Sequence, residues 1–452
     1  MTDDQQPTQG PTGATPTEQA QIQRILQVAP EAVPFPGTPG AEVEYLYRRN
    51  KIIVRDANLD SVTRGLDGRG VTNSVDREFP LVGVTRLTLP ETNEGDAERS
   101  LAAEIRRIEA VEGPRAAGLD HLFYVCGHSC AAIEPERAAR KAIPVPRPQI
   151  GQDAAVPRSR HGKKVRVLVM DTGLVERAAQ DHAWMTGVDG DIDTLVRPDG
   201  TILQDGGHGT FVAGCVRVTA PEAKVHVVNA AQLLTLRKKD EGEEDGEEDG
   251  IGAAFESDLA DLVRKHLVAD DDQPPLRVPD ILVLNFAGTT QGGRPPVALA
   301  ALYDSVIQHV KELLILSPAG NEGDRRKNWP ASFAWVVSVG GLAANWRDRA
   351  SWSNHGHNVD VYAPGDRLVN AFATGHYVCG WDPAPHEVRI FKGMALWSGT
   401  SFSTPLVAGL VASRMSTTGQ SSRRAWESLF DLAERQAVPG VGPVLYPGQE
   451  LA

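Results

Sequence analysis

The amino-acid sequence predicts an α/β fold in which a mostly parallel sheet carries helices on both faces, preceded by a small α+β unit. From Lys164 onward, short apolar runs typical of buried strands alternate with longer helical stretches, and this alternation favours a parallel sheet. The predicted strands are Val165–Met170, Lys224–Ala230, Ile281–Leu284, Leu313–Leu316, Val336–Val339 and Val359–Tyr362, and the predicted helices are Ala254–Leu267, Pro296–Val310, Ser401–Met415 and Ser422–Gln436.

The 452 residues divide into four predicted parts. Residues 1–40 are rich in Gln, Thr, Pro and Gly, which predicts a mobile tail apart from a short helix near Glu18–Val28. Residues 41–130 form the small α+β unit, residues 131–160 have the composition of a linker, and residues 161–452 form the large unit. Within the small unit the predicted strands are Lys51–Val54, Val82–Leu87 and His121–Val125, and the predicted helix is Leu101–Ala110.

The acidic character of the chain is mostly local. The formal net charge is −13, and eight carboxylates fall between Asp240 and Asp249. This run predicts a disordered surface insertion near residues 237–252, with a calcium site or a recognition tract for basic substrates left open. The shorter cluster from Asp189 to Asp193 alternates carboxylates as calcium loops do, but lacks their downstream glutamate and is predicted to be a polar loop. The negative balance excludes a general binder of nucleic-acid phosphates.

Export, membrane and cofactor signals are weak. No stretch approaches the ~18–20 apolar residues that span a bilayer, and the first residues carry neither a basic nor an apolar signal region, so we expect a cytoplasmic protein. Four cysteines do not indicate a disulfide scaffold. Cys126 and Cys130 could bind a metal with His128, but they lack a second pair of thiols. We therefore expect no metal and no cofactor, with calcium left open.

Three segments place reactive side chains at the ends of predicted elements. Asp171 follows the strand Val165–Met170, while His208 and Ser401 each open an apolar helix after glycines. The start of a helix favours developing negative charge, because its first N–H groups are unpaired. A hydroxyl nucleophile needs a base near pH 7, and that base needs a carboxylate to hold its tautomer. Alone, each residue reads equally well as structural; together they predict a nucleophilic serine.

On these motifs the chain resembles the subtilisin-type serine peptidases, the subtilase family. The order Asp, His, Ser is that of subtilisin, and the resemblance covers roughly residues 160–416. The segment Ala319–Gly323 adds a fourth motif, and the resemblance implies that the Asn321 amide binds the oxyanion beside the Ser401 backbone N–H. A turn asparagine is the structural alternative. An α/β-hydrolase would need a histidine after the serine, and none follows Ser401.

Some positions depart from the family pattern. Phe402 and Ser403 follow the serine where the family commonly has Met-Ala, and Phe211 stands where a second histidine is usual. Gly288 and Thr289 replace the usual Leu-Gly of the substrate-binding strand. Cleavage specificity therefore cannot be carried over from the family.

The sequence thus predicts a serine endopeptidase with a subtilisin-like fold. We expect an extended polypeptide substrate to lie along two segments, made of Phe286, Ala287, Gly288, Ser317, Pro318, Ala319 and Gly320. The alternative is a gated or catalytically silent peptide-binding protein on the same scaffold. Residues 41–130 form either a propeptide or a permanently attached domain that recognises the substrate or a regulatory protein partner. Neither nucleic acid nor membrane is an expected partner.

Overall fold

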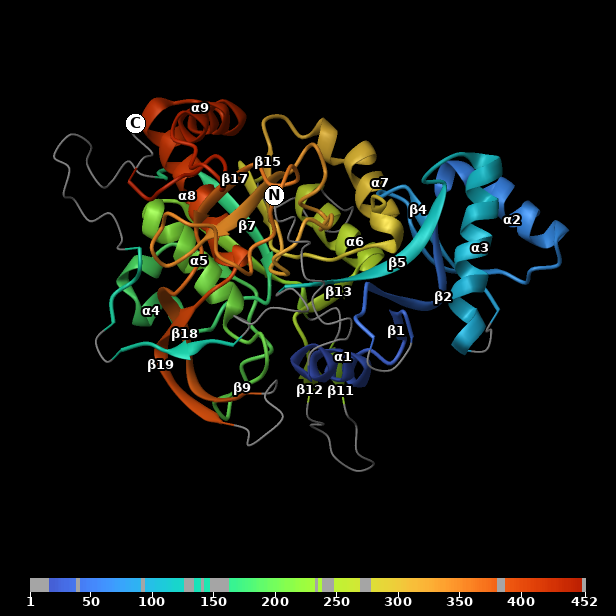
Figure 1. The fold of residues 1–452 in the computed structure, drawn as a ribbon, viewed down its shortest axis with the longest axis horizontal. Helices are drawn as coiled ribbons and strands as arrows, with labels where there is room; N and C mark the ends of the chain where they lie inside the picture. Colours follow the sequence, from blue (N-terminus) through green and yellow to red (C-terminus); the bar gives the residue numbers. More distant parts are fainter. Residues whose placement is uncertain are drawn as a thin grey trace, which may run out of the picture.

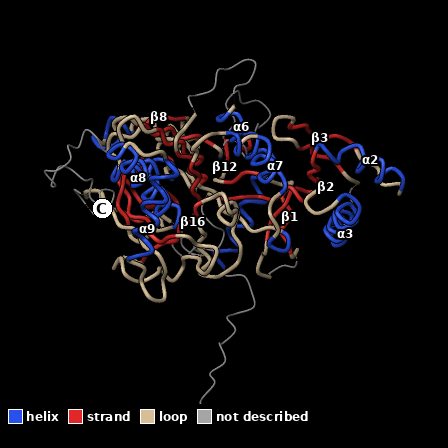
Figure 2. The backbone as a smooth tube through the Cα atoms, turned by 90° about the horizontal axis from the view of Figure 1, so that it is seen from above, coloured by secondary structure: helices blue, strands red, loops and turns tan. Residues whose placement is uncertain are grey.

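A computed structural model describes residues 16–37, 41–90, 94–125, 134–139, 142–146, 162–231, 235–237, 248–268, 278–379 and 387–448. Two units lie side by side (Figure 1), and the amino-terminal helices α2 and α3 lie at the end of the molecule away from α8 and α9 (Figure 2). None of the helices in this part of the chain combines the length and the apolar character needed to cross a bilayer.

The large unit is built on a seven-stranded sheet in the order β17-β16-β15-β14-β7-β10-β8. Every neighbouring pair in it is parallel. This confirms the predicted fold class, since parallel strands need crossover connections that place helices on the faces of the sheet. The strands are β7 (Arg166–Asp171), β8 (Val188–Gly190), β10 (Lys224–Asn229), β14 (Ile281–Leu284), β15 (Leu314–Pro318), β16 (Val337–Leu342) and β17 (Val361–Pro364).

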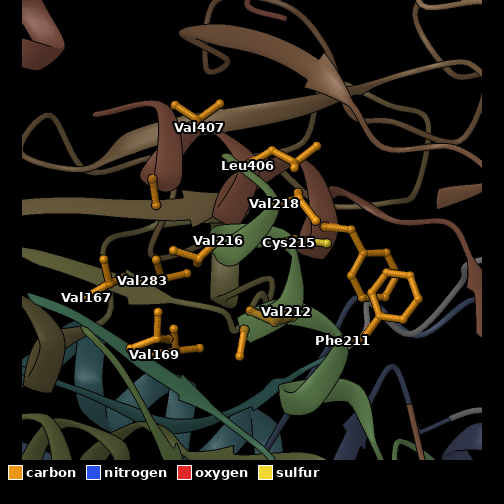
Figure 3. Close-up of a cluster of buried hydrophobic side chains, with 14 of the residues drawn as sticks. Val167, Val169, Phe211, Val212, Cys215, Val216, Val218, Val283, Leu406 and Val407 are labelled. Carbon is orange, nitrogen blue, oxygen red and sulfur yellow. The ribbon is translucent and has the colours of Figure 1, made fainter. Parts of the chain in front are cut away.

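Apolar residues on both faces of the sheet pack against helices. Successive residues of a strand point to opposite faces, so Val167 and Val169 belong to the core under α5 and α8, as Figure 3 shows, whereas Leu168 and Met170 belong to the core under α6 and α7. The sequence around α5 and α8 is apolar on every side, which suits helices buried between the sheet and other elements. The helices are α4 (Ala178–Asp181), α5 (His208–Thr219), α6 (Glu256–Leu267), α7 (Val297–Ser305), α8 (Thr400–Thr418) and α9 (Ser422–Arg435).

The amino-terminal unit is an antiparallel sheet in the order β13-β5-β2-β4-β3, with β1 paired to β2. Apolar side chains of α2 and α3, including Leu66 and Ile105, pack against this sheet. Strand β13 (Ala253–Phe255) belongs in sequence to the large unit, so one sheet crosses the boundary. The other elements are β1 (Ala32–Phe35), β2 (Tyr45–Arg55), α2 (Leu59–Gly68), β3 (Ser74–Phe79), β4 (Val84–Thr88), α3 (Glu94–Glu112) and β5 (Ala117–Tyr124).

Residues 1–40 were predicted to be a mobile tail apart from a short helix near Glu18–Val28, and the structure corrects this prediction for the residues that follow the helix, up to residue 37. Helix α1 (Pro16–Val28) forms where a short helix was expected, and β1 follows it. Ile22, Ile25 and Val28 of α1 are buried against a cluster that includes Ile251 and Phe255. The sequence-based argument counted the polar residues and underweighted these three apolar side chains at helical spacing.

The linker and the acidic insertion are also partly ordered. Residues 136–137 of the predicted linker form β6 (Glu136–Arg137), which pairs with β19 (Val388–Trp397) of a long hairpin with β18 (Leu368–Val378). Strand β9 (Thr201–Ile202) pairs with β18. The flanks of the insertion pair as β11 (Thr235–Arg237) and β12 (Glu248–Gly250), and Ile251 is buried, so disorder cannot extend to residue 252. Residues 238–247 lie outside the described part of the chain.

Candidate active site

Asp171 is the last residue of β7 and is fully buried. Its carboxylate accepts hydrogen bonds from Asn285 Nδ2 at 2.6 Å and from the backbone N–H of Thr172 at 2.7 Å. The same carboxylate lies 2.8 Å and 3.1 Å from His208 Nδ1. Hydrogen bonds from several donors hold this buried carboxylate in one orientation, because no water is available there to stabilise its charge in another.

His208 is the first residue of α5, and its side chain has no exposed surface. Because Nδ1 faces the Asp171 carboxylate, this nitrogen carries the proton, and Nε2 keeps a free lone pair. Nε2 has no hydrogen-bond partner among the described residues. The ring packs against Trp397 and Phe402, with centroids 5.2 Å and 5.1 Å away. The arrangement is that of an imidazole base supported by a carboxylate.

Ser401 is the second residue of α8 and is 2% exposed. Its hydroxyl does not donate to His208; it donates to the backbone carbonyl oxygen of Val125 at 3.2 Å. The serine therefore stands at a helix N-terminus, as predicted, with a peptide carbonyl of the chain itself in front of it.

Asn321 follows β15 and reaches the start of α8. Its Oδ1 accepts hydrogen bonds from the backbone N–H of Thr400 at 2.9 Å and from the Thr400 hydroxyl at 2.8 Å. Because both bonds use the oxygen, the amide is fixed with its Nδ2 donor free for another acceptor. The side chain thus lies beside the residue that precedes Ser401.

The predicted substrate-binding residues fall into two groups. Ala287 pairs with Tyr124 through two backbone hydrogen bonds, of 3.0 Å and 2.8 Å, whereas Gly288 pairs with Trp329. The second group lies along and after β15: Ser317 donates to the Phe286 carbonyl at 3.3 Å, and the Ala319 N–H donates to Val339. All seven residues lie at or just after the ends of these two strands: Phe286, Ala287 and Gly288 follow β14, Ser317 and Pro318 end β15, and Ala319 and Gly320 come just after it.

A segment of the amino-terminal unit, residues 122–125, occupies this site. Strand β5 is flanked by β13, in the register Leu122↔Phe255, and continues to Val125, whose N–H donates to the Gly252 carbonyl at 2.7 Å. On its other side it pairs with Ala287. A side chain at Gly288 would meet the Phe123 ring at 2.8 Å, so this glycine permits the close approach. No local pattern in the sequence indicates this placement.

Sequence reasoning also missed two acceptors beside the site. Glu322 Oε1 and Asn328 Oδ1 are buried atoms without a hydrogen-bond partner among the described residues. The Glu322 and Asn328 side chains pack against Gly320, where an added Cβ would lie 2.1 Å from Asn328 Nδ2 and 2.6 Å from Glu322 Oε2. Only the spacing of these residues in a known motif could have flagged them, because neither stands out by type.

Metal ligands were expected to be absent, and calcium was left open. Among the described residues no group of three or more His, Cys, Asp or Glu side chains is arranged to hold a metal ion. Cys126, His128 and Cys130 lie outside the described residues. In the cluster predicted to be a polar loop, Asp189 is exposed, but Asp193 is 1% exposed and hydrogen-bonded, which corrects the prediction for that residue.

Comparison with known proteins places this geometry in a family. The sequence profile described as "Subtilase family" matches residues 162–437. An "Intracellular serine protease" from Paenibacillus polymyxa is 29% identical over 272 residues, covering 58% of this chain and 69% of that protein. An "Alkaline proteinase" from Hapsidospora chrysogena is 33% identical, but only over 30% of this chain and 31% of that protein.

Solved structures agree at the level of the fold. Fervidolysin from Fervidobacterium pennivorans, described as a keratinolytic enzyme related to subtilisin, superposes with a TM-score of 0.54 at 16% sequence identity. The match covers 90% of this chain and 61% of fervidolysin. The chain therefore belongs to the subtilase family and is a subtilisin-like serine protease.

Proposed function

We propose that the chain is an endopeptidase in which Asp171, His208 and Ser401 form the catalytic triad. Ser401 Oγ attacks the scissile carbonyl carbon while His208 Nε2 takes the hydroxyl proton and later returns it to the leaving amine. Asp171 holds the imidazole in the required tautomer and stabilises its protonated form. The products are a peptide with a new amino terminus and, after attack by water on the acyl-enzyme, one with a new carboxyl terminus.

The observation that carries this proposal is the peptide carbonyl at the nucleophile. The chain's own Val125 carbonyl lies 3.2 Å from Ser401 Oγ, and the residues before it run extended between β13 and Ala287. A substrate that took the same path would have its main chain fixed on both sides, as cleavage requires. Interior segments of a polypeptide suit such a path, which supports endopeptidase action.

We infer that Asn321 supplies the oxyanion contact. Its oxygen is held by Thr400, so its N–H donor is oriented before any substrate arrives. Preorganised donors stabilise the charge that develops on the carbonyl oxygen in the transition state, together with the backbone N–H of Ser401.

A fluorophosphonate probe tests the chemistry directly, since it reacts with an activated serine and reports its position by peptide mapping. Once residues 122–125 are displaced, wild type should be labelled at Ser401 and hydrolyse peptides, whereas Ser401→Ala should do neither. Ser403→Ala, a buried serine two residues along the same helix, is the matched control and should retain both. Peptide binding by a wild type that neither labels nor hydrolyses would instead identify the gated or silent binding protein.

We further propose that the amino-terminal unit blocks the site until it is displaced. Support comes from residues 122–125 and from a buried polar contact between the units: Arg48 pairs with Asp258 at 2.6 Å, and Asp120 accepts from the Ser257 N–H at 3.0 Å. Asp120 has no exposed surface. Removing one partner of such a pair would leave the other charge buried and unpaired, at a cost of about 3–5 kcal/mol.

An experiment can tell whether the amino-terminal unit is a propeptide that is cut off or a domain that stays attached. A propeptide should be cut by the enzyme, so purified wild type should shorten with time to a fragment beginning between about residues 126 and 164, while Ser401→Ala stays at full length. A permanent regulatory domain should leave wild type intact, with activity rising only when a protein partner displaces residues 122–125. Gel electrophoresis and amino-terminal sequencing distinguish the two.

Location and cofactor use follow as smaller proposals. We propose that the protein acts in the cytoplasm, which the intracellular relative from Paenibacillus polymyxa supports; cell fractionation tests it. We also propose that catalysis needs no metal or other cofactor, because the Asp–His–Ser chemistry is complete in itself. A loss of activity with EDTA that calcium restores would overturn this.

A further inference from the structure

Asp193 is a buried carboxylate that the proposed mechanism does not use. It lies in the segment between β8 and α5, is 1% exposed, and accepts the Leu195 N–H at 2.9 Å through Oδ1. Its other oxygen, Oδ2, accepts the Gly207 N–H at 2.7 Å and the Thr172 hydroxyl at 3.2 Å. Burial raises the pKa of Asp193 to about 7, and the three hydrogen bonds act in the opposite direction. Such a group is costly to bury and needs all its donors.

The partners of Asp193 flank two residues of the triad. Thr172 directly follows Asp171 and donates its own N–H to the Asp171 carboxylate at 2.7 Å. Gly207 directly precedes His208 and is the N-cap residue of α5. The Thr172 hydroxyl also accepts the Gly209 N–H at 3.0 Å. Residues on both sides of His208 are therefore hydrogen-bonded to one carboxylate and one hydroxyl that sit next to Asp171.

This connection satisfies groups that α5 cannot satisfy itself. The first N–H groups of a helix have no partner within the helix, and no side chain of the α5 N-terminus caps them. Thr172 and Asp193 supply the acceptors from outside, and a carboxylate at this end is favoured by the helix dipole. The packing is close: a side chain at Gly209 would lie 2.3 Å from the Gly173 carbonyl oxygen.

We propose that Asp193 is a positioning residue of the active site, which acts with the Thr172 hydroxyl to fix the start of α5 against the end of β7. This rests on the proposed function, because the geometry it fixes is the 2.8 Å contact between Asp171 and His208 Nδ1. Reaction rates depend steeply on such geometry, and a displacement of about 1 Å can cost roughly 10²-fold. We expect mutation of Asp193 or Thr172 to change kcat rather than substrate affinity, since their side chains bond to Leu195, Gly207 and Gly209 and not to residues 122–125.

The test compares four variants. Asp193→Asn keeps the size but replaces one acceptor by a donor, and Thr172→Val removes the hydroxyl at nearly constant shape. Both should lower kcat by about 10- to 100-fold with KM unchanged. Thr172→Ser restores the hydroxyl and should restore kcat. Asp189→Asn removes a carboxylate of the same segment that is 81% exposed and should behave as wild type.

A second readout does not depend on turnover. The proton between His208 Nδ1 and the Asp171 carboxylate gives a far-downfield NMR signal in the full chain, which should shift or broaden in Asp193→Asn and Thr172→Val and return in Thr172→Ser. If these variants unfold at lower temperature yet keep both kcat and this resonance, Asp193 is only a structural residue and the proposal fails. If wild type shows the resonance but hydrolyses nothing even after residues 122–125 are displaced, the proposed function fails while the positioning role can still be judged by NMR.

Discussion

At the scale of single residues, Asn321 uses the two ends of its amide for different tasks. The oxygen accepts two hydrogen bonds from Thr400 and belongs to the folded structure, whereas the nitrogen is the donor that we propose for the oxyanion. This division allows the structural contribution and the catalytic contribution of one side chain to be separated by mutation.

We expect Asn321→Asp to keep the contacts with Thr400 and to lose the donor. The aspartate also places negative charge where the oxyanion forms, so kcat should fall by about 10²–10³ or more while KM changes little. Asn321→Leu should show the same loss of kcat with an added loss of thermal stability. Steady-state kinetics and thermal unfolding of both variants provide the measurement. A rise in KM with unchanged kcat would mark Asn321 as a ground-state contact.

Glu322 and Asn328 lie beside Gly320 and Asn321, and Glu322 Oε2 accepts hydrogen bonds from Asn328 Nδ2 at 3.2 Å and from Asn354 Nδ2 at 2.7 Å. Glu322 Oε1 and Asn328 Oδ1 have no partner among the described residues. The substrate residue whose carbonyl is attacked projects its side chain from the neighbouring atom, so that side chain enters the space next to the oxyanion donor. Buried acceptors without partners at this place favour a donor from the substrate, because an unsatisfied buried acceptor costs about 1–3 kcal/mol.

We therefore expect peptides with Arg or Lys before the scissile bond to be cleaved faster than peptides with norleucine there. Glu322→Gln should lower this preference in kcat/KM by roughly tenfold to a hundredfold, since hydrogen bonds to charged groups contribute about 1.5–3 kcal/mol. Asp324→Asn is the control, because the Asp324 carboxylate on the same loop is paired with Arg326 instead. Equal rates for all three peptides would contradict the expectation.

At the scale of elements, α1 extends the amino-terminal unit over the occupied site. Ile22, Ile25 and Val28 bury their side chains in a cluster that contains Leu122 and Tyr124 of β5 as well as residues of β13. The helix therefore packs on both partners of the strand pair that leads to Ser401, and its apolar face holds them together.

We expect Ile25→Ala to loosen this arrangement without touching the catalytic residues. Ile25 is 2% exposed, and truncating a buried isoleucine to alanine costs about 2–5 kcal/mol. Residues 122–125 should then exchange their amide hydrogens faster, and fluorophosphonate labelling of Ser401 should speed up. Gln19→Ala on the exposed side of the same helix is the control. Unchanged labelling would mean that α1 does not contribute to blocking the site.

The sequence was most informative where local pattern and tertiary role coincide. The parallel strands of the large unit are continuous apolar runs, and Asp171, His208 and Ser401 stand at element ends next to glycines, so both were predictable. The β18–β19 hairpin was missed because residue type does not follow burial in β19: buried and less buried positions alternate from Phe391 to Trp397, but Gly393 and Ala395 occupy buried positions while Met394 and Leu396 occupy the others. The burial of Asp193 and the path of Leu122–Val125 depend on contacts between segments far apart in the chain, which no local pattern encodes.

At the scale of the whole molecule, His121 links the two units at a buried position. Its Nδ1 faces Glu256 of α6 at 3.3 Å, and its Nε2 accepts the Gln291 N–H at 3.1 Å. Burial lowers the pKa of His121 to about 4. The imidazole is therefore neutral in the assembled molecule at pH values where an exposed histidine, with a pKa near 6.5, is already protonated.

Because the pKa of His121 is lowered, the free energy of unfolding must decrease as the pH falls. The contribution of His121 to stability is complete above about pH 6.5 and is lost as the pH falls towards 4, because only the unfolded chain binds the proton in this window; the loss reaches about 3 kcal/mol at most. We expect His121→Gln to flatten this part of the stability curve, measured by denaturant unfolding between pH 7 and pH 4. The same slope in both proteins would assign the effect to other groups.

Strand β13 would be left with an unpaired backbone if its partner β5 were removed. Its three residues, Ala253, Ala254 and Phe255, are buried and pair with β5. An enzyme that has lost its amino-terminal unit would expose this backbone as an unpaired strand edge, and such edges recruit any extended chain, including a second copy of the same protein. The pairing of β5 with β13 would thus also prevent self-association, and we expect the freed enzyme to stay monomeric best when substrate is abundant.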